Sequence, residues 1–268
     1  MIRIATNSFS WNTTYNKGLP ELDAAAICRE AAACGAAGIE MDPSCITAAE
    51  LAGAGIALSG ASTGGPLFDD WTAADEDAVV ATARQAKALG GEYVFFTAAP
   101  KGGWGAQEVV TAHDLRRAGD RLNALATRVR AEGAALGLHN HAASADGLAA
   151  EVALVRDHTD PALVGPYLDV GWAFCSDADP LELIREFGPR CMGFHFRNHR
   201  ADKVPTQTLA EGVLGIPAIA QAVVATGYRG WVSLELWHRE DVTLTRTMAE
   251  CQRESLAYLR DLFGLGAL

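Results

Sequence analysis

Two histidines lie two residues apart in the segment LGLHNH, at His139 and His141, directly after an apolar run. In an extended strand, residues i and i+2 point to the same side, so both imidazoles can converge on one site. Alternatively, one histidine binds a ligand and the other is only its neighbour. The polar residues that follow other apolar runs help to decide between these interpretations.

Three further polar residues occur in comparable positions along the chain. Asp169 lies in GPYLDVGW, His195 in MGFHFRNH and Glu235 in WVSLELW. Two imidazoles and two carboxylates suit a borderline divalent ion such as Mn²⁺, Fe²⁺, Co²⁺ or Zn²⁺. Oxygen ligands alone would have indicated Mg²⁺ or Ca²⁺, and the absence of cysteine argues against a closed structural zinc site. Four protein ligands would leave room for two adjacent substrate oxygens.

Short apolar runs alternate with Ala-rich amphipathic segments along the whole chain. We expect strands at residues 2–6, 38–41, 56–59, 93–96, 135–139, 164–169, 192–196 and 232–236. We expect helices at residues 21–34, 48–53, 73–89, 114–132, 148–157, 180–187, 216–226 and 245–262. Several of these helical segments stop at glycine, as is usual for helix ends.

Strict strand–helix alternation indicates parallel strands covered by helices. Eight such units without a linker predict an α/β fold, a single (β/α)8 TIM barrel formed by residues 1–268 as one domain. An open sheet would want a glycine-rich phosphate loop after its first strand, and NSFSWNTTYNKGLP has no such motif. In a barrel, catalytic groups lie at the C-terminal ends of the strands.

His139, Asp169, His195 and Glu235 then fall on four consecutive strands, and we expect them to bind one metal ion. Each also has a plainer explanation. A lone histidine at a strand end is more often a hydrogen-bonded structural residue, Asp169 could organise a turn, and Glu235 could pair with Arg197 or Arg239. The register on four neighbouring strands favours the metal site, because parallel barrel strands force such residues together.

Loop residues supply candidate contacts to a substrate. We expect substrate binding by Glu40, Arg197, Trp172, His199 and Lys203, although Glu40 could equally be an ion-pair partner at the rim. Tryptophans in βα loops either pack against the C–H face of a sugar or cover the barrel top; they are Trp11, Trp104, Trp172 and Trp237. The segments SGASTGGPLFDDW and FFTAAPKGGWGAQ are expected to be lid or substrate loops, and no phosphate cradle is apparent after strands seven or eight.

Composition excludes several classes of protein. With 49% hydrophobic and 21% charged residues, the chain is an ordinary globular protein. A net charge of −11 argues against nucleic-acid binding, which needs a basic surface. No run approaches the ~18 apolar residues of a membrane span, and the N-terminus reads as a strand and not as a signal peptide. Six scattered cysteines predict reduced thiols in a cytoplasmic protein.

The segments LGLHNH, YLDVGWAF and EGVLGIPAIAQAVVATGYRGWVSLELW resemble the xylose-isomerase-like TIM barrels. That superfamily contains sugar isomerases and epimerases, inosose dehydratases and relatives of endonuclease IV. In its ketose 3-epimerases one divalent ion, commonly Mn²⁺, is held by Glu, Asp, His and Glu from strands five to eight. The resemblance implies the same role for Asp169, His195 and Glu235, whereas His139 stands where the epimerases have glutamate. It also implies a homodimer or homotetramer.

The expected activity is that of a metal-dependent isomerase or epimerase acting on a keto sugar or keto-inositol by proton abstraction next to the carbonyl. Mn²⁺ is the first choice of metal, with Co²⁺, Zn²⁺ or Mg²⁺ as alternatives. We assign catalytic roles to Glu235 and His141 and ligand roles to His139, Asp169, His195 and Glu235. The alternative is a lyase on the same scaffold, an inosose-type dehydratase or an enzyme that cleaves 3-keto glycosides, which the histidine at 139 slightly favours.

Two other functions are weaker. Retention of Asp169, His195 and Glu235 speaks against a sugar-binding barrel whose metal site has decayed. Metal-assisted hydrolysis of DNA fails on the acidic charge and on the lack of further ligands for a metal cluster.

Overall fold

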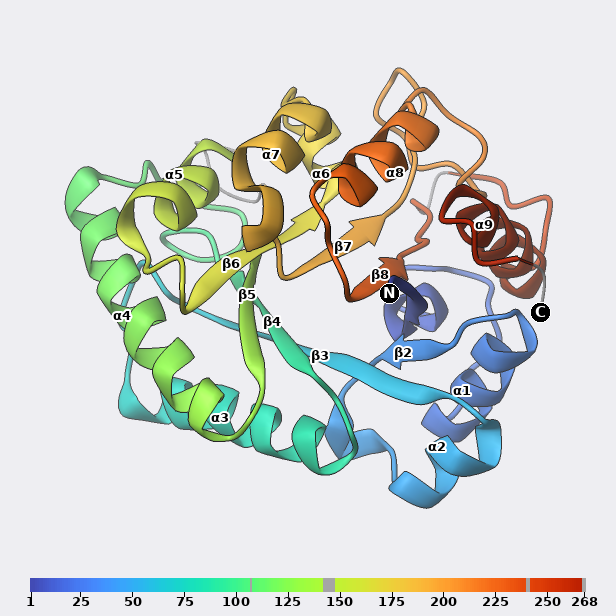
Figure 1. Cartoon of the computed structure of the whole chain (residues 1–268), viewed down its shortest axis with the longest axis horizontal. Helices are drawn as coiled ribbons and strands as arrows, with labels where there is room; N and C mark the ends of the chain where they lie inside the picture. Colours follow the sequence, from blue (N-terminus) through green and yellow to red (C-terminus); the bar gives the residue numbers. More distant parts are fainter. Residues whose placement is uncertain (107, 142–147, 240–241, 267–268) are drawn as a thin grey trace.

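A computed structural model describes residues 1–106, 108–141, 148–239 and 242–266 of the protein. Eight parallel strands close into a barrel in chain order, with β1 paired to both β2 and β8 (Figure 1). The predicted (β/α)8 barrel is therefore confirmed. The strands are β1 (Arg3–Asn7), β2 (Gly38–Glu40), β3 (Ala57–Gly65), β4 (Tyr93–Ala98), β5 (Ala135–His139), β6 (Val164–Asp169), β7 (Gly193–Phe196) and β8 (Trp231–Leu234).

Helices surround the barrel (Figure 1). Within the described residues they are α1 (Ala24–Ala33), α2 (Ala48–Ala54), α3 (Ala73–Ala88), α4 (Ala112–Ala131), α5 (Leu148–His158), α6 (Val170–Cys175), α7 (Pro180–Phe187), α8 (Ile216–Ala225) and α9 (Met248–Leu262). Short 3₁₀ helices lie at Ser8–Trp11, Pro43–Cys45 and Gly188–Arg190. The apolar faces of the α-helices and the outer faces of the strands form the main hydrophobic core.

A second, smaller core fills the barrel interior. It consists of Ala5, Tyr93, Phe95, Tyr167 and Trp231. Glycines on neighbouring strands make room for these large rings: a Cβ at Gly60 would lie 2.2 Å from the ring of Tyr93, and one at Gly193 would lie 2.1 Å from the ring of Tyr167. Large and small residues thus alternate across the interior, as close packing requires.

Strand β3 is longer than its sequence predicts. Residues 60–65, expected to begin a lid, continue the strand and pair with β4 from Gly60↔Tyr93 to Gly65↔Ala98. The prediction of a loop here was wrong because glycine-rich sequence is unfavourable in strands. Within the barrel, Gly60 is instead required, because the ring of Tyr93 occupies the space where a side chain would lie.

Helix α6 is a second difference. It follows β6 without a loop, and the carboxylate of Asp169 accepts a hydrogen bond from the backbone N–H of Trp172 at 2.7 Å. Asp169 therefore caps a helix, as aspartate commonly does, and also faces the barrel mouth. Asp169 lies at the strand end as expected, and it caps a helix where the sequence suggested a turn.

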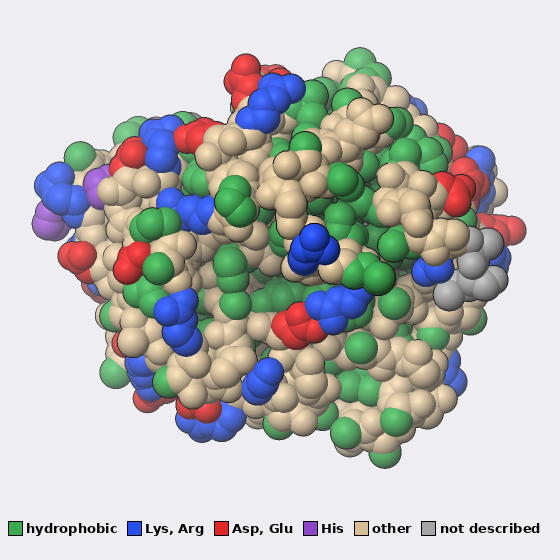
Figure 2. Space-filling model, in the orientation of Figure 1, with side chains coloured by type: hydrophobic (Ala, Val, Ile, Leu, Met, Phe, Trp, Pro, Cys, Tyr) green, Lys and Arg blue, Asp and Glu red, His purple; other side chains and the backbone are tan. Residues whose placement is uncertain are grey.

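The charged surface, the cysteines and the lengths of the helices can be compared with the expectations from composition. Figure 2 shows Lys and Arg side chains interspersed with Asp and Glu over the face in view, without a continuous basic stripe. All six cysteines are free. Within the described residues, every helix is too short or too polar to cross a membrane.

Candidate metal centre and active site

Four side chains from consecutive strand ends converge at the barrel mouth. They are His139 of β5, Asp169 of β6, His195 of β7 and Glu235, which directly follows β8. All four are buried, and one ligand atom of each lies within 4.8 Å of the others. Nε2 of His139 lies 3.0 Å from Nδ1 of His195, which lies 2.7 Å from the carboxylate of Glu235.

Strand register explains this convergence. Asp169 pairs with His195 across β6 and β7, and the backbone N–H of Glu235 donates to the carbonyl of Phe196 at 3.1 Å. Strand ends at one height therefore deliver their side chains to one place, as the sequence analysis expected. The donor set of two imidazoles and two carboxylates fits a divalent transition ion, so this cluster can hold a metal.

The charges of the cluster are suited to binding a cation. Burial acts to raise the pKa of Glu235, but His195 and Arg197 outweigh it and lower the pKa to about 2. Asp169 likewise has a lowered pKa, because Arg197 and the two imidazoles outweigh its burial. Burial lowers the pKa of His139 and thereby favours the neutral imidazole. Metal ligands must be deprotonated, and these three groups meet that condition. Burial acts to lower the pKa of His195, but Glu235 and Glu40 outweigh it and raise the pKa to about 10, so an ion that binds Nδ1 of His195 must displace a proton from it.

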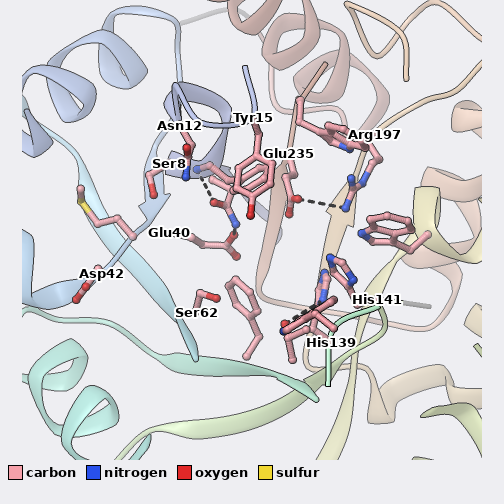
Figure 3. Close-up of a pocket in the computed structure, with 18 residues that line it drawn as sticks. Ser8, Asn12, Tyr15, Glu40, Asp42, Ser62, His139, His141, Arg197 and Glu235 are labelled. Atoms are coloured by element: carbon pink, nitrogen blue, oxygen red, sulfur yellow. Dashed lines mark hydrogen bonds and ion pairs between the residues drawn. The ribbon is translucent and has the colours of Figure 1, made fainter. Parts of the chain in front are cut away.

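Arg197 bridges the two carboxylates of the cluster. Its Nε donates to Asp169 at 2.9 Å, and its Nη2 also donates to Asp169. The same Nη2 donates to Glu235 at 3.1 Å (Figure 3). Its guanidinium also lies over the ring of Trp172, 5.1 Å from the centroid. The ion pair between Glu235 and Arg197, which the sequence offered as a plainer explanation for Glu235, is present in the structure.

Glu40 lies against the far side of His195. One carboxylate oxygen accepts from Nε2 of His195 at 2.7 Å and from Nδ2 of Asn7 at 3.0 Å. The other accepts from the hydroxyl of Tyr93 at 2.7 Å and from that of Tyr167. This leaves Nδ1 of His195 facing the cluster, an arrangement typical of carboxylates that orient metal-binding histidines.

His141 lies beyond the cluster, between two tryptophans. Its ring centroid is 4.5 Å from that of Trp172 and 5.4 Å from that of Trp104. Burial, together with the neighbouring His139 and Arg197, lowers the pKa of His141 to about 4. A neutral imidazole near pH 7 can accept a proton.

A cavity of about 710 Å³ opens above these groups. Glu40, His139, His141, Arg197 and Glu235 line it, as do Trp104, Trp172 and Trp237. Its opposite side carries polar side chains that were not singled out in the sequence (Figure 3): Ser8 and Asn12 from the segment after β1, Asp42 after β2 and Ser62 within β3. Such residues are common in any loop, and only the folded barrel shows that these four share one surface.

Three residues singled out in the sequence lie elsewhere. His199 does not line the cavity; it is buried beside Phe174, with the ring centroids 6.1 Å apart. Lys203 donates to Asp177 at 2.7 Å and to the carbonyl of Cys175 at 3.0 Å, so its ammonium group joins the loop after β7 to the end of α6. Trp11 is buried and donates to Glu30 at 2.7 Å.

With this geometry established, known proteins can be compared. A family model described as a xylose isomerase-like TIM barrel matches residues 18–262. The chain belongs to this family. The resemblance noted in the sequence is therefore confirmed.

Curated relatives of the chain are named as dehydratases. The inosose dehydratase of Salmonella typhimurium is 28% identical over 131 residues, which cover 42% of this chain and 44% of that protein. Inosose dehydratase 1 of Bacillus cereus is 24% identical over 144 residues, which cover 47% of this chain and 48% of that protein. The matched residues thus span less than half the length of these curated relatives.

Solved structures share the fold over nearly the whole chain. An L-ribulose 3-epimerase has a TM-score of 0.74 at 20% identity and covers 99% of this chain and 95% of its own. A probable 3-DHS dehydratase, AsbF of Bacillus anthracis, has a TM-score of 0.74 at 14% identity, covering 96% and 98%. At these identities the similarity shows the fold, which accommodates both kinds of enzyme.

Proposed function

We propose that the protein is a divalent-metal-dependent isomerase or epimerase acting on a keto sugar or keto-inositol. The observation that carries this proposal is the four-ligand cluster with the neutral imidazole of His141 in the same cavity. The residues that hold the ion are His139, Asp169, His195 and Glu235, with Mn²⁺ as the first choice for this donor set.

Each group has a role in proton transfer next to a carbonyl. A bound divalent ion would polarise the carbonyl and stabilise the negative charge that develops on its oxygen. His141 lines the cavity beside the cluster and accepts the proton from the carbon next to the carbonyl. Glu235 holds the ion and serves as the second acid/base group, and Arg197 restrains the carboxylates of Asp169 and Glu235.

A lyase is the second candidate. It is favoured by the inosose dehydratases among the relatives and by His139, which removes the second carboxylate that the epimerase mechanism uses. Elimination begins with the same proton abstraction and ends with loss of a group from the next carbon. Proton abstraction by His141 is therefore common to both candidates.

Incubation of Mn²⁺-loaded protein with ketoses and inososes in D₂O tests the proposal. We expect deuterium at the carbon next to the carbonyl, with the carbon skeleton retained. A dehydrated or cleaved product would instead support the lyase. Loaded protein that exchanges no proton in any of these ketones would contradict both candidates.

Two variants separate the histidines. His141→Ala should still bind the metal but lose about 10²–10⁴-fold in turnover, the usual contribution of a general base. His139→Ala should lose the metal itself. The opposite pattern would exchange the two roles.

A further inference from the structure

The cavity lining includes two groups of side chains that differ in chemistry. One is a row of rings in which Trp104 contacts His141, His141 contacts Trp172, and Trp172 stacks on Trp237 with centroids 6.5 Å apart. The other group, which we call the polar wall, consists of Ser8, Asn12, Asp42 and Ser62, and Phe9, Tyr15 and Met41 from the same segments also line the cavity. In Figure 3 this polar wall lies opposite His141 and Arg197.

The polar wall has free hydrogen-bonding groups. Oδ1 of Asn12 accepts from the backbone N–H of Thr14 at 2.9 Å, and Oδ1 of Asp42 accepts from that of Ser44 at 2.9 Å. Toward the rest of the described residues, Nδ2 of Asn12, Oδ2 of Asp42 and the hydroxyl of Ser62 make no hydrogen bond. All three side chains are exposed. They can therefore both donate to and accept from hydroxyl groups of a bound molecule.

The charge of the lining is unfavourable for an anion. Glu40, Asp42 and Glu235 contribute carboxylates. Among the residues that the structure describes, Arg197 is the only lysine or arginine in the lining. Its guanidinium already binds Asp169 and Glu235. The positions outside the described residues (107, 142–147, 240–241 and 267–268) contain no lysine, arginine or histidine in the sequence.

We propose that the substrate is an uncharged polyhydroxylated ketone whose hydroxyl groups bind Asn12, Asp42 and Ser62, and that phosphate esters are excluded. This rests on the proposed function and names its substrate class. A phosphate dianion at the polar wall would meet Asp42 without a cation to balance it, and like charges in contact disfavour binding strongly. The ring wall packs against the C–H face of the same molecule.

Fluorescence titration of the Mn²⁺-loaded protein tests this, because tryptophans line the cavity. The probes are matched pairs: D-fructose with D-fructose 6-phosphate, and myo-inositol with myo-inositol 1-phosphate. We expect an uncharged member to bind at least about tenfold more tightly than its phosphate, a difference of about 1.4 kcal/mol.

Asp42→Asn is the decisive variant. Asparagine caps a helix as well as aspartate does, so the local fold is kept. We expect weaker binding of the uncharged ligand and stronger binding of the phosphate, each by roughly three- to tenfold, since about 1 kcal/mol separates charged from neutral hydrogen bonds. Opposite changes for the two ligands cannot arise from loss of folding.

The inference would be overturned by a phosphate ester that binds as tightly as its uncharged partner, or by a selectivity that is unchanged in Asp42→Asn. It would also be overturned if no uncharged probe binds at concentrations well above about 1 mM, the upper range of ordinary KM values. The deuterium exchange experiment reports on the proposed function separately. Deuterium exchange in a sugar phosphate would reject this inference and support the proposed function. Binding of an uncharged probe without exchange in any ketone would support this inference and reject the proposed function.

Discussion

Glu40 lies behind His195 and restrains the orientation of its imidazole. Its carboxylate accepts hydrogen bonds from His195, Asn7, Tyr93 and Tyr167. Burial alone would raise its pKa, but the charge of His195 and these hydrogen bonds outweigh burial and lower the pKa. When His195 gives up one proton to bind an ion, the carboxylate behind it keeps the remaining proton on Nε2 and leaves Nδ1 for the cluster.

Glu40→Gln should therefore weaken the affinity for Mn²⁺ by about 10- to 100-fold, as loss of such partners commonly does. Calorimetric titration of the metal-free protein measures this without reference to activity. Asp42→Asn is the matched control, since Asp42 lies two residues further along the chain and accepts its hydrogen bond from Ser44 and not from His195. Equal Mn²⁺ affinities of Glu40→Gln and the unaltered protein would contradict a positioning role for Glu40.

At the scale of elements, two helical glycines differ sharply in their surroundings. Gly119 in α4 packs so closely on the end of α5 that a Cβ would lie 2.2 Å from the carbonyl oxygen of His158. Gly53 in α2 has no atom within 4 Å of the same position. The two glycines therefore make a matched pair for testing how the outer helices pack.

Gly119→Ala should lower the free energy of unfolding by about 1–3 kcal/mol, the usual range for overpacking. Gly53→Ala should raise it by about 0.5–1 kcal/mol, because alanine is the better helix former. Urea unfolding of the metal-free proteins gives both values. Similar stability changes in the two variants would show that the approach of α4 to α5 is looser than described.

Some elements could be predicted from the sequence and others could not, for identifiable reasons. Strands β5 and β6 begin and end where expected, because apolar runs there stop at polar residues. Residues 60–65 of β3 were missed because their glycines read as a loop, and the packing of the Tyr93 ring explains the glycine at position 60. Helix α6 was missed because it is six residues long and follows β6 without a loop.

The candidate site, like the fold, could be predicted from the sequence only in part. The four candidate ligands could be chosen from sequence because barrel strands repeat at regular intervals and end at one height. The contacts of Glu40 could not, because Tyr93 and Tyr167 reach it across the barrel interior from β4 and β6. The polar wall lacks any periodic pattern, so nothing in the chain order links Asn12 with Asp42 or Ser62.

At the scale of the whole molecule, the closed barrel is what turns four separated residues into one centre. Between His139 and Glu235 lie three strand–helix units, and closure of the sheet brings their ends to one mouth. The same closure places the ring wall and the polar wall around that centre. The proposed reaction and the proposed substrate class therefore both depend on the binding of a metal ion at this centre.

Calorimetric titration of the metal-free protein with Mn²⁺ tests that claim most directly. We predict one saturable site per chain, loss of that site in His139→Ala and in Asp169→Asn, and a thermal stability that rises with Mn²⁺ concentration, because an ion bound only to the folded state stabilises it. Absence of saturable binding, or unchanged binding in both variants, would contradict the account.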